Sequence, residues 1–192
     1  EICACLVGSE MCIRDSHNHT EYSLLDGATK VYDMVKRAAD LGMPAVAITD
    51  HGVMSGVPEL ADACDKVKAE TGTWVKPIFG CEIYFTTDSS LKKEGKQKLH
   101  HMILLAKNNT GYHNIVKLVS ESHVDNFYYR PRTTFEMLEK YSEGVIATSA
   151  CIAGIIPRCV DAGKIDEAIE WAKKLSALYE PGDFYIELQD QG

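Results

Sequence analysis

The chain has 192 residues, of which 45% are hydrophobic and 25% charged, as in an ordinary globular protein with a sizeable core. Its net charge of −8 excludes a general electrostatic attraction to nucleic acid, so such contact needs a local patch, metal ions or parts of a longer protein. No apolar run approaches the ~20 residues of a membrane span. The seven cysteines are odd in number and lack a C-x-x-C pair, which favours a reducing cytoplasm over a disulfide framework.

Hydrophobic periodicity predicts strands and helices that alternate along the chain. Short apolar runs predict strands, in chain order, over 45–49, 76–85, 101–107, 144–151 and 183–189. Helical spacing predicts helices from a cap at Thr29 to a stop at Gly42, and then over 57–70, 111–122, 133–141 and 164–180. The helix over 133–141 opens with a capping box of Thr133 and Glu136. This alternation predicts an α/β fold, a parallel sheet with helices outside it, either open or closed as a barrel.

Side chains that bind metals are concentrated near the predicted strand ends. His17 and His19 flank one residue, so in an extended segment both point the same way. Asp26 follows in a loop, and Asp50 and His51 come directly after the strand over 45–49. In parallel α/β sheets, functional residues lie beyond the carboxyl ends of the strands.

Three further residues complete this set. Glu82 lies inside an apolar strand, where a carboxylate is costly unless it is paired or bound to a cation. His101 begins the next strand and so departs from the strand-end rule, whereas Cys151 ends the strand over 144–151. Histidine, carboxylate and one cysteine suit Zn²⁺, Mn²⁺ or Fe²⁺ and can hold more than one ion. Clustered metals of this kind generate a hydroxide at neutral pH and bind the oxygens of a phosphate ester.

Other residues of these types receive a structural interpretation. Cys64 and Cys159 lie within helical patterns and Cys81 faces away from Glu82, so all three are predicted core residues. The isolated histidines His100, His113 and His123 are given no role. The stretch FYYRPR (127–132) places Arg130 and Arg132 among aromatic residues, as in nucleic-acid contacts. It fits equally well a loop fixed by tyrosine packing and Pro131, and the basic segment 86–98 is a predicted mobile loop.

Several motifs, read together, resemble one family. HNHTEYSLLDGA, AVAITDHGVMSG, KPIFGCEIY, FYYRPR and GVIATSACIAGIIP occur in the order typical of the N-terminal PHP (polymerase and histidinol phosphatase) domain of bacterial DNA polymerase III alpha subunits. The resemblance implies a distorted (β/α)₇ barrel that holds up to three divalent metal ions. Carried over by position, the implied metal ligands are His17, His19, Asp26, His51, Glu82, His101 and Cys151, with Asp50 beside the site.

The resemblance also implies a role in DNA replication. The parent protein would be a DNA-directed DNA polymerase in the cytoplasm, whose polymerase active site is absent from this chain. Its partners would be DNA and other replicative subunits, including an exonuclease subunit in some members. No membrane would be among its partners. The domain itself would be a metal-dependent phosphoesterase, with 3′–5′ exonuclease proofreading in some members. The alternative is a catalytically silent, metal-stabilised module that supports the polymerase domains. A free-standing small-molecule phosphatase fits the polymerase-type motifs poorly.

Two departures from the family pattern affect the boundaries. The family's last two ligands form a D-x-H element downstream of ELQDQG, and the chain ends at Gly192 before it. We therefore expect a PHP domain over 17–192 that is truncated before its last strands. The family enters H-x-H from an apolar strand, but CLVGSEMCIRDS stands there instead. Residues 1–16 are accordingly expected to be foreign or disordered.

Overall fold

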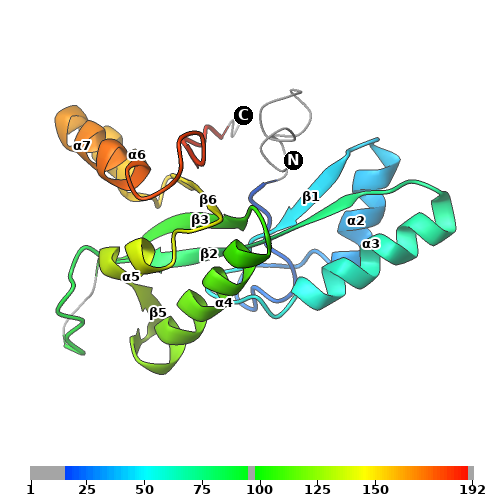
Figure 1. Ribbon diagram of the computed structural model, residues 1–192, viewed down its shortest axis with the longest axis horizontal. Helices are drawn as coiled ribbons and strands as arrows, with labels where there is room; N and C mark the ends of the chain where they lie inside the picture. Colours follow the sequence, from blue (N-terminus) through cyan, green and yellow to red (C-terminus); the bar gives the residue numbers. More distant parts are fainter. Residues whose placement is uncertain (1–15, 95–97, 190–192) are drawn as a thin grey trace. The chain divides into compact units, whose positions relative to one another are not determined.

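The computed structural model describes residues 16–94 and 98–189 and shows a mixed α/β fold (Figure 1). It divides into two compact units between Cys81 and Glu82, and the long strand β2 (Lys76–Phe85) contributes to both. The expectation for residues 1–16 falls, except for Ser16, outside the described residues. Within the described ranges, every helix is too short or too polar to cross a membrane.

The first unit is built on a pair of parallel strands. Its elements are α2 (Val31–Asp40), β1 (Ala45–Ile48), α3 (Val57–Thr71) and the first part of β2. The register of β1 and β2 runs from Ala45 opposite Lys76 to Ile48 opposite Phe79. Helices α2 and α3 pack against each other (Figure 1) and bury apolar side chains that include Val31, Val35, Leu60 and Val67.

The ends of α2 test two predictions. The stop at Gly42 is confirmed, because the helix ends at Asp40 and Gly42 has a φ of +70°, which glycine adopts without strain. The predicted cap at Thr29 is wrong. Lys30 is the N-cap residue, and Thr29 instead forms a parallel bridge with Thr20.

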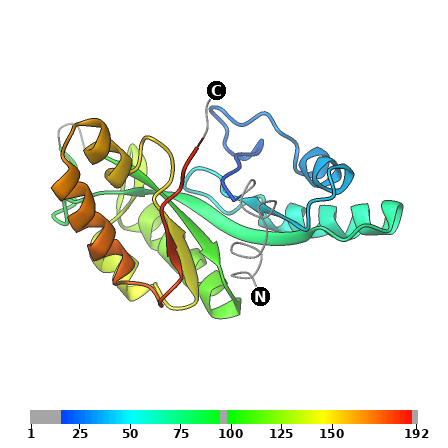
Figure 2. The ribbon, with the colours of Figure 1, turned by 90° about the horizontal axis from the view of Figure 1, so that it is seen from above.

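The second unit contains most of the sheet. Its strands follow the order β4-β5-β2-β3-β6-β7 and comprise β3 (His100–Ala106), β4 (Phe127–Tyr128), β5 (Arg130–Thr133), β6 (Val145–Thr148), β7 (Phe184–Tyr185) and the end of β2. Its helices are α4 (Asn109–Val124), α5 (Phe135–Lys140), α6 (Ile155–Asp161) and α7 (Ile165–Ser176). Helix α4 packs against β3, β5 and β6, whereas α7 packs against α6 and β7 (Figure 2).

The sheet is mixed and open, so the expectation of a parallel sheet is only partly right. Strands β2 and β5, and β6 and β7, pair in parallel. Strands β3 and β6 are antiparallel, as are β4 and β5. A parallel pair requires a crossover, usually a single helix, but α4, the β4–β5 hairpin and α5 connect β3 to β6. Sequence periodicity missed this hairpin because each of its strands has only two to four residues.

Smaller differences concern helix ends near the carboxyl terminus. The N-cap of α5 is Thr134, whose hydroxyl accepts from the Met137 amide, so the predicted capping box of Thr133 and Glu136 is wrong and the helix is capped one residue later. Residues 155–161 form α6, which the sequence reading did not predict. Helix α7 ends at Ser176, because the next residues turn toward β7.

Candidate metal centre

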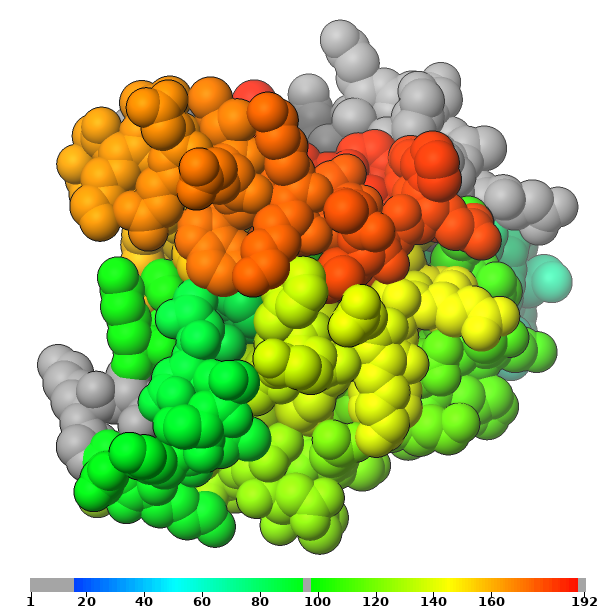
Figure 3. Space-filling model, turned by 60° about the vertical axis from the view of Figure 1, so that its left-hand side comes forward, coloured from blue at the N-terminus to red at the C-terminus, as the bar shows by residue number. Residues whose placement is uncertain are grey.

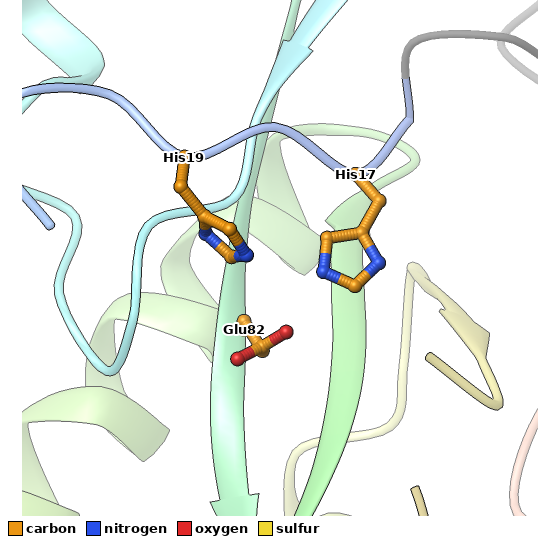
Figure 4. Close-up of side chains that lie close together, drawn as sticks. All are labelled: His17, His19 and Glu82. Atoms are coloured by element: carbon orange, nitrogen blue, oxygen red, sulfur yellow. The ribbon is translucent and has the colours of Figure 1, made fainter. Parts of the chain in front are cut away.

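The H-x-H segment of the first unit lies beside the end of β1. The Thr49 amide donates to the Asn18 carbonyl at 3.0 Å, and the Asn18 amide donates to the Thr49 hydroxyl at 2.8 Å. These bonds hold the segment extended, so His17 and His19 project to the same side, as predicted (Figure 4). Their rings meet edge to face, with centroids 5.0 Å apart.

His51 and Asp26 join this pair of histidines. The ring of His51 stacks on that of His19, with centroids 3.9 Å apart. Its Nε2 lies 2.9 Å from a carboxylate oxygen of Asp26. Two imidazolium rings would repel each other at the stacking distance, whereas neutral imidazoles, the form that binds metals, would not. Four of the predicted ligands in the first unit therefore form one contiguous group of His17, His19, Asp26 and His51.

Asp50 organises the loop that carries Asp26. Its carboxylate is 1% exposed and accepts hydrogen bonds from the Thr20 amide at 2.6 Å and the Ser23 hydroxyl at 2.8 Å. The Ser23 hydroxyl in turn accepts from the His51 amide at 3.1 Å. Asp50 is therefore fully engaged with protein donors and acts as a positioning residue. The sequence reading missed Thr20 and Ser23, although two hydroxyl residues directly after an H-x-H element are a usable signal.

Gly27 closes the same loop for a steric reason. A Cβ at this position would lie 1.8 Å from the Thr20 carbonyl oxygen, so no other residue fits without moving the backbone. The Gly27 amide also donates to the Ser23 carbonyl at 2.8 Å. The loop from Thr20 to Gly27 is thus fixed by backbone contacts and by Asp50 together.

We expect Asp50→Asn to loosen this loop. One acceptor becomes a donor that faces Thr20 and Ser23, which should lower the free energy of unfolding by about 1–3 kcal/mol. Metal affinity should fall about 10–100-fold, as for other residues that orient ligands. Thermal unfolding and a Mn²⁺ titration measure the two effects. The control is Asp40→Asn, an exposed residue at the end of α2; equal behaviour of both variants would contradict the positioning role.

In the second unit, the predicted ligands are Glu82, His101 and Cys151. Glu82 projects from β2 and is 1% exposed (Figure 4). The Nδ1 atom of His101 lies 2.9 Å from the Glu82 carboxylate and 3.7 Å from the Cys151 sulfur. Cys151 follows β6, and the bridge between His101 and Gly154 holds the following turn beside β3. His101 therefore reaches the group although it lies at the start of its strand.

The electrostatics of this group reflect mutual stabilisation of charge. Burial lowers the pKa of His101, but its hydrogen bonds to Cys151 and Glu82 outweigh burial and raise that pKa to about 9. The hydrogen bond to His101 lowers the pKa of the Cys151 thiol. The Glu82 carboxylate and the Cys151 sulfur thus both face the Nδ1 atom of His101, and a divalent cation can take the place of a proton among such ligands.

The donor chemistry fits divalent metal ions. Across the described residues, the side chains that could hold a metal ion include His17, His19, His51, Glu82 and His101. Imidazole, carboxylate and thiolate are ligands for Zn²⁺, Mn²⁺ and Fe²⁺. Burying a carboxylate such as Glu82 also costs free energy unless a cation or hydrogen-bond donors lie beside it. A bound metal ion would offset this cost.

The two predicted arginines have different environments. Arg130 is exposed, and its guanidinium carbon lies 5.3 Å from the centre of the Tyr84 ring. Arg132 is 0% exposed and donates to the backbone carbonyls of Asn126, Leu91 and Lys92 at 2.9–3.1 Å. Arg132 is therefore a structural residue, which corrects its prediction as a nucleic-acid contact. Arg130 keeps its guanidinium at the surface, where that prediction stays open.

Comparisons with known proteins agree with this arrangement. The sequence profile of the PHP domain matches residues 15–191. The chain is 45% identical over 183 residues to DNA polymerase III subunit alpha of Borreliella burgdorferi, a match that covers 92% of this chain and 15% of the relative. The chain is also 40% identical over 181 residues to DNA polymerase III subunit alpha of Aquifex aeolicus. This match covers 90% of this chain and 15% of the relative. The chain thus spans about 15% of the length of these curated relatives.

A solved structure provides a weaker likeness. A protein from Bifidobacterium adolescentis matches 87% of this chain and 57% of its own, with 23% identity and a TM-score of 0.38, which is too low to support an argument about this chain. The profile, by contrast, covers every described residue. This chain belongs to the PHP domain family.

Proposed function

We propose that this chain is a metal-dependent phosphoesterase module. The proposed ligands of divalent metal ions are His17, His19, Asp26, His51, Glu82, His101 and Cys151. The observation that carries the proposal is the buried Glu82 carboxylate, 2.9 Å from the His101 ring in the middle of a strand. A core carboxylate with an imidazole and a thiol beside it fits a metal ligand better than an element of packing.

The protein side chains have distinct tasks in this proposal. Bound divalent ions would supply a nucleophile at neutral pH and neutralise the charge of a phosphate ester. Asp26 holds the His51 ring through Nε2, and stacking on His19 fixes the plane of that ring. Asp50 keeps the loop with Asp26 in place through Thr20 and Ser23. Burial of Glu82 excludes water from its carboxylate, which strengthens its attraction to a cation.

We infer further that the module belongs to a longer replicative DNA polymerase. Support comes from the curated relatives named DNA polymerase III subunit alpha, of which this chain spans about 15%. In this setting the substrate is the 3′ end of DNA, the activity is 3′–5′ exonuclease proofreading, and the partners are DNA and other replicative subunits. The DNA polymerase activity belongs to parts of such a protein outside this chain.

A metal-stabilised structural module is the second candidate. The contact between His51 and Asp26 joins the end of β1 to the loop after the H-x-H segment. A metal ion bound there would fasten two stretches of backbone even without catalysis. In this case the ligands would contribute to stability alone.

Metal content and hydrolysis separate the two candidates. The chain is loaded with Mn²⁺, Zn²⁺ or Fe²⁺, its metal content is measured by elemental analysis, and hydrolysis of bis-p-nitrophenyl phosphate is assayed with and without EDTA. Bound metal with EDTA-sensitive hydrolysis supports the phosphoesterase. Bound metal without hydrolysis supports the structural module and contradicts the phosphoesterase.

A further inference from the structure

The β4–β5 hairpin presents aromatic side chains to solvent. Phe127 pairs with Pro131, and Tyr128 pairs with Arg130, so Tyr129 forms the turn. Tyr129 has a φ of +58°, a conformation that bulky residues rarely adopt, and it is 80% exposed. Phe127, on the preceding strand, is 46% exposed. The Tyr129 ring meets the Tyr128 ring edge to face, with centroids 4.6 Å apart, and still leaves most of its surface open to solvent. A strained tyrosine that exposes its ring at a hairpin tip points to binding.

Arg132 makes this hairpin a fixed platform. Its three donors reach the carbonyls of Asn126 before the hairpin and of Leu91 and Lys92 in the loop after β2. Its guanidinium carbon also lies 5.5 Å from the centre of the Tyr128 ring. Hairpin and loop are therefore tied to each other by one buried side chain. In Figure 3 the green surface of this loop adjoins the yellow-green surface around the hairpin.

Arg130 connects the hairpin to the proposed metal ligands of the second unit. Its guanidinium carbon lies 5.3 Å from the Tyr84 ring centre. The Tyr84 ring in turn meets the His101 ring edge to face, with centroids 5.4 Å apart. The exposed guanidinium of Arg130 is thus connected to His101 through the Tyr84 ring alone. A DNA strand with one phosphate bound by Arg130 would extend from there toward the group of Glu82, His101 and Cys151.

The charges around the hairpin are of both signs, with Asp88 also exposed in the loop after β2. Lys92 and Lys93 are exposed in the loop that Arg132 holds. Lys92 Nζ lies 4.0 Å from the Glu94 carboxylate, and Asp125 is exposed just before the hairpin. An acidic peptide would find few cations here, whereas an unpaired nucleotide needs one cation and one aromatic face.

We propose that the β4–β5 hairpin binds single-stranded DNA, with the Tyr129 ring stacked on a base and the Arg130 guanidinium on a phosphate. This inference rests on the proposed function for the substrate class and adds the residues that recognise it. Single strands fit better than duplexes, because an exposed aromatic face can stack only on an unstacked base. Tyr84 and Arg132 act as positioning residues, since the first supports Arg130 and the second supports the hairpin.

The test measures binding of a fluorescent oligodeoxythymidylate to the full chain by anisotropy, at low salt and with EDTA present. The first variant is Tyr129→Asn, because asparagine tolerates a positive φ and removes only the ring. The second is Arg130→Gln. The matched controls are Trp74→Asn, another exposed aromatic residue (45%), and Arg37→Gln, an exposed arginine on α2.

Tyr129→Asn should weaken binding about 10-fold, as expected for loss of one base stack. Arg130→Gln should lower the slope of log Kobs against log salt by about 0.7, the value for one phosphate contact on a single strand. The controls should bind like the original chain, and a duplex should compete poorly. Unchanged affinity and salt slope in both variants, or equal binding of duplex and single strand, would overturn the proposal.

The same variants separate this inference from the proposed function. EDTA removes metal chemistry from the binding measurement, so binding is expected whether or not the chain hydrolyses phosphodiesters. Hydrolysis of bis-p-nitrophenyl phosphate, which has no base to stack, should be insensitive to Tyr129→Asn. Unchanged binding in both variants together with hydrolysis therefore refutes the hairpin proposal alone, whereas weakened binding in the variants without any hydrolysis by the original chain refutes the phosphoesterase alone.

Discussion

Glu82→Gln is expected to abolish metal-dependent stabilisation and to reduce phosphodiester hydrolysis at least about 100-fold. Mutation of residues that only orient metal ligands already lowers metal affinity or activity about 10–100-fold, so loss of a ligand should have at least the larger effect. Glutamine keeps the size of the side chain, so the packing of β2 should persist. It removes the negative charge, however, and presents either a neutral oxygen or an amide donor to His101, 2.9 Å away. A neutral ligand at this buried position binds a divalent cation much more weakly.

The decisive readout is stability rather than activity. A metal that binds only the folded chain stabilises it by RT ln(1 + [L]/Kd), which is about 2.7 kcal/mol at a hundredfold excess over Kd. The original chain should show this gain when Mn²⁺ is added to the EDTA-treated protein, and Glu82→Gln should not. Glu170→Gln, an exposed substitution on α7, is the matched control and should retain the full gain. A normal gain in Glu82→Gln would remove Glu82 from the ligand set.

Sequence patterns predicted best where local chemistry is unambiguous. The bounds of β2 agree with the prediction over 76–85, because a continuous apolar run with one carboxylate has few alternative structures. The shared orientation of His17 and His19 followed from the two-residue repeat of an extended chain alone. The stop at Gly42 followed from the freedom of glycine at positive φ.

Tertiary effects account for what the sequence did not predict. Segment 127–133 reads as a loop because its pattern is too short for periodicity, and it becomes a hairpin through pairing of β5 with β2. The burial of Arg132 likewise depends on carbonyls up to 41 residues away in sequence. The organising role of Asp50 arises from Thr20 and Ser23, about 30 residues earlier. Such contacts have no local signature, so residue type alone left Arg132 and Asp50 ambiguous.

Arg132→Met is expected to lower the free energy of unfolding by about 3 kcal/mol, because three backbone carbonyls lose charge-assisted hydrogen bonds. Methionine fills part of the volume but donates nothing. One effect opposes this loss: burying a guanidinium is costly, and its removal recovers part of that cost. In the folded chain the carbonyls of Asn126, Leu91 and Lys92 offset that cost, and the loss of their hydrogen bonds should dominate.

Urea unfolding measures the change in stability, and limited proteolysis locates it. New cleavage should occur near Leu91 and Asn126, the two stretches that Arg132 ties together. Arg37→Met, on the exposed face of α2, should stay within about 0.5 kcal/mol of the original chain. Unchanged stability in Arg132→Met would mean that water replaces the guanidinium at all three carbonyls. Tyr129→Asn changes no buried contact and should leave stability unchanged. A stability loss confined to Arg132→Met would therefore identify Arg132 as the residue that positions the hairpin and leave Tyr129 as the residue that contacts DNA.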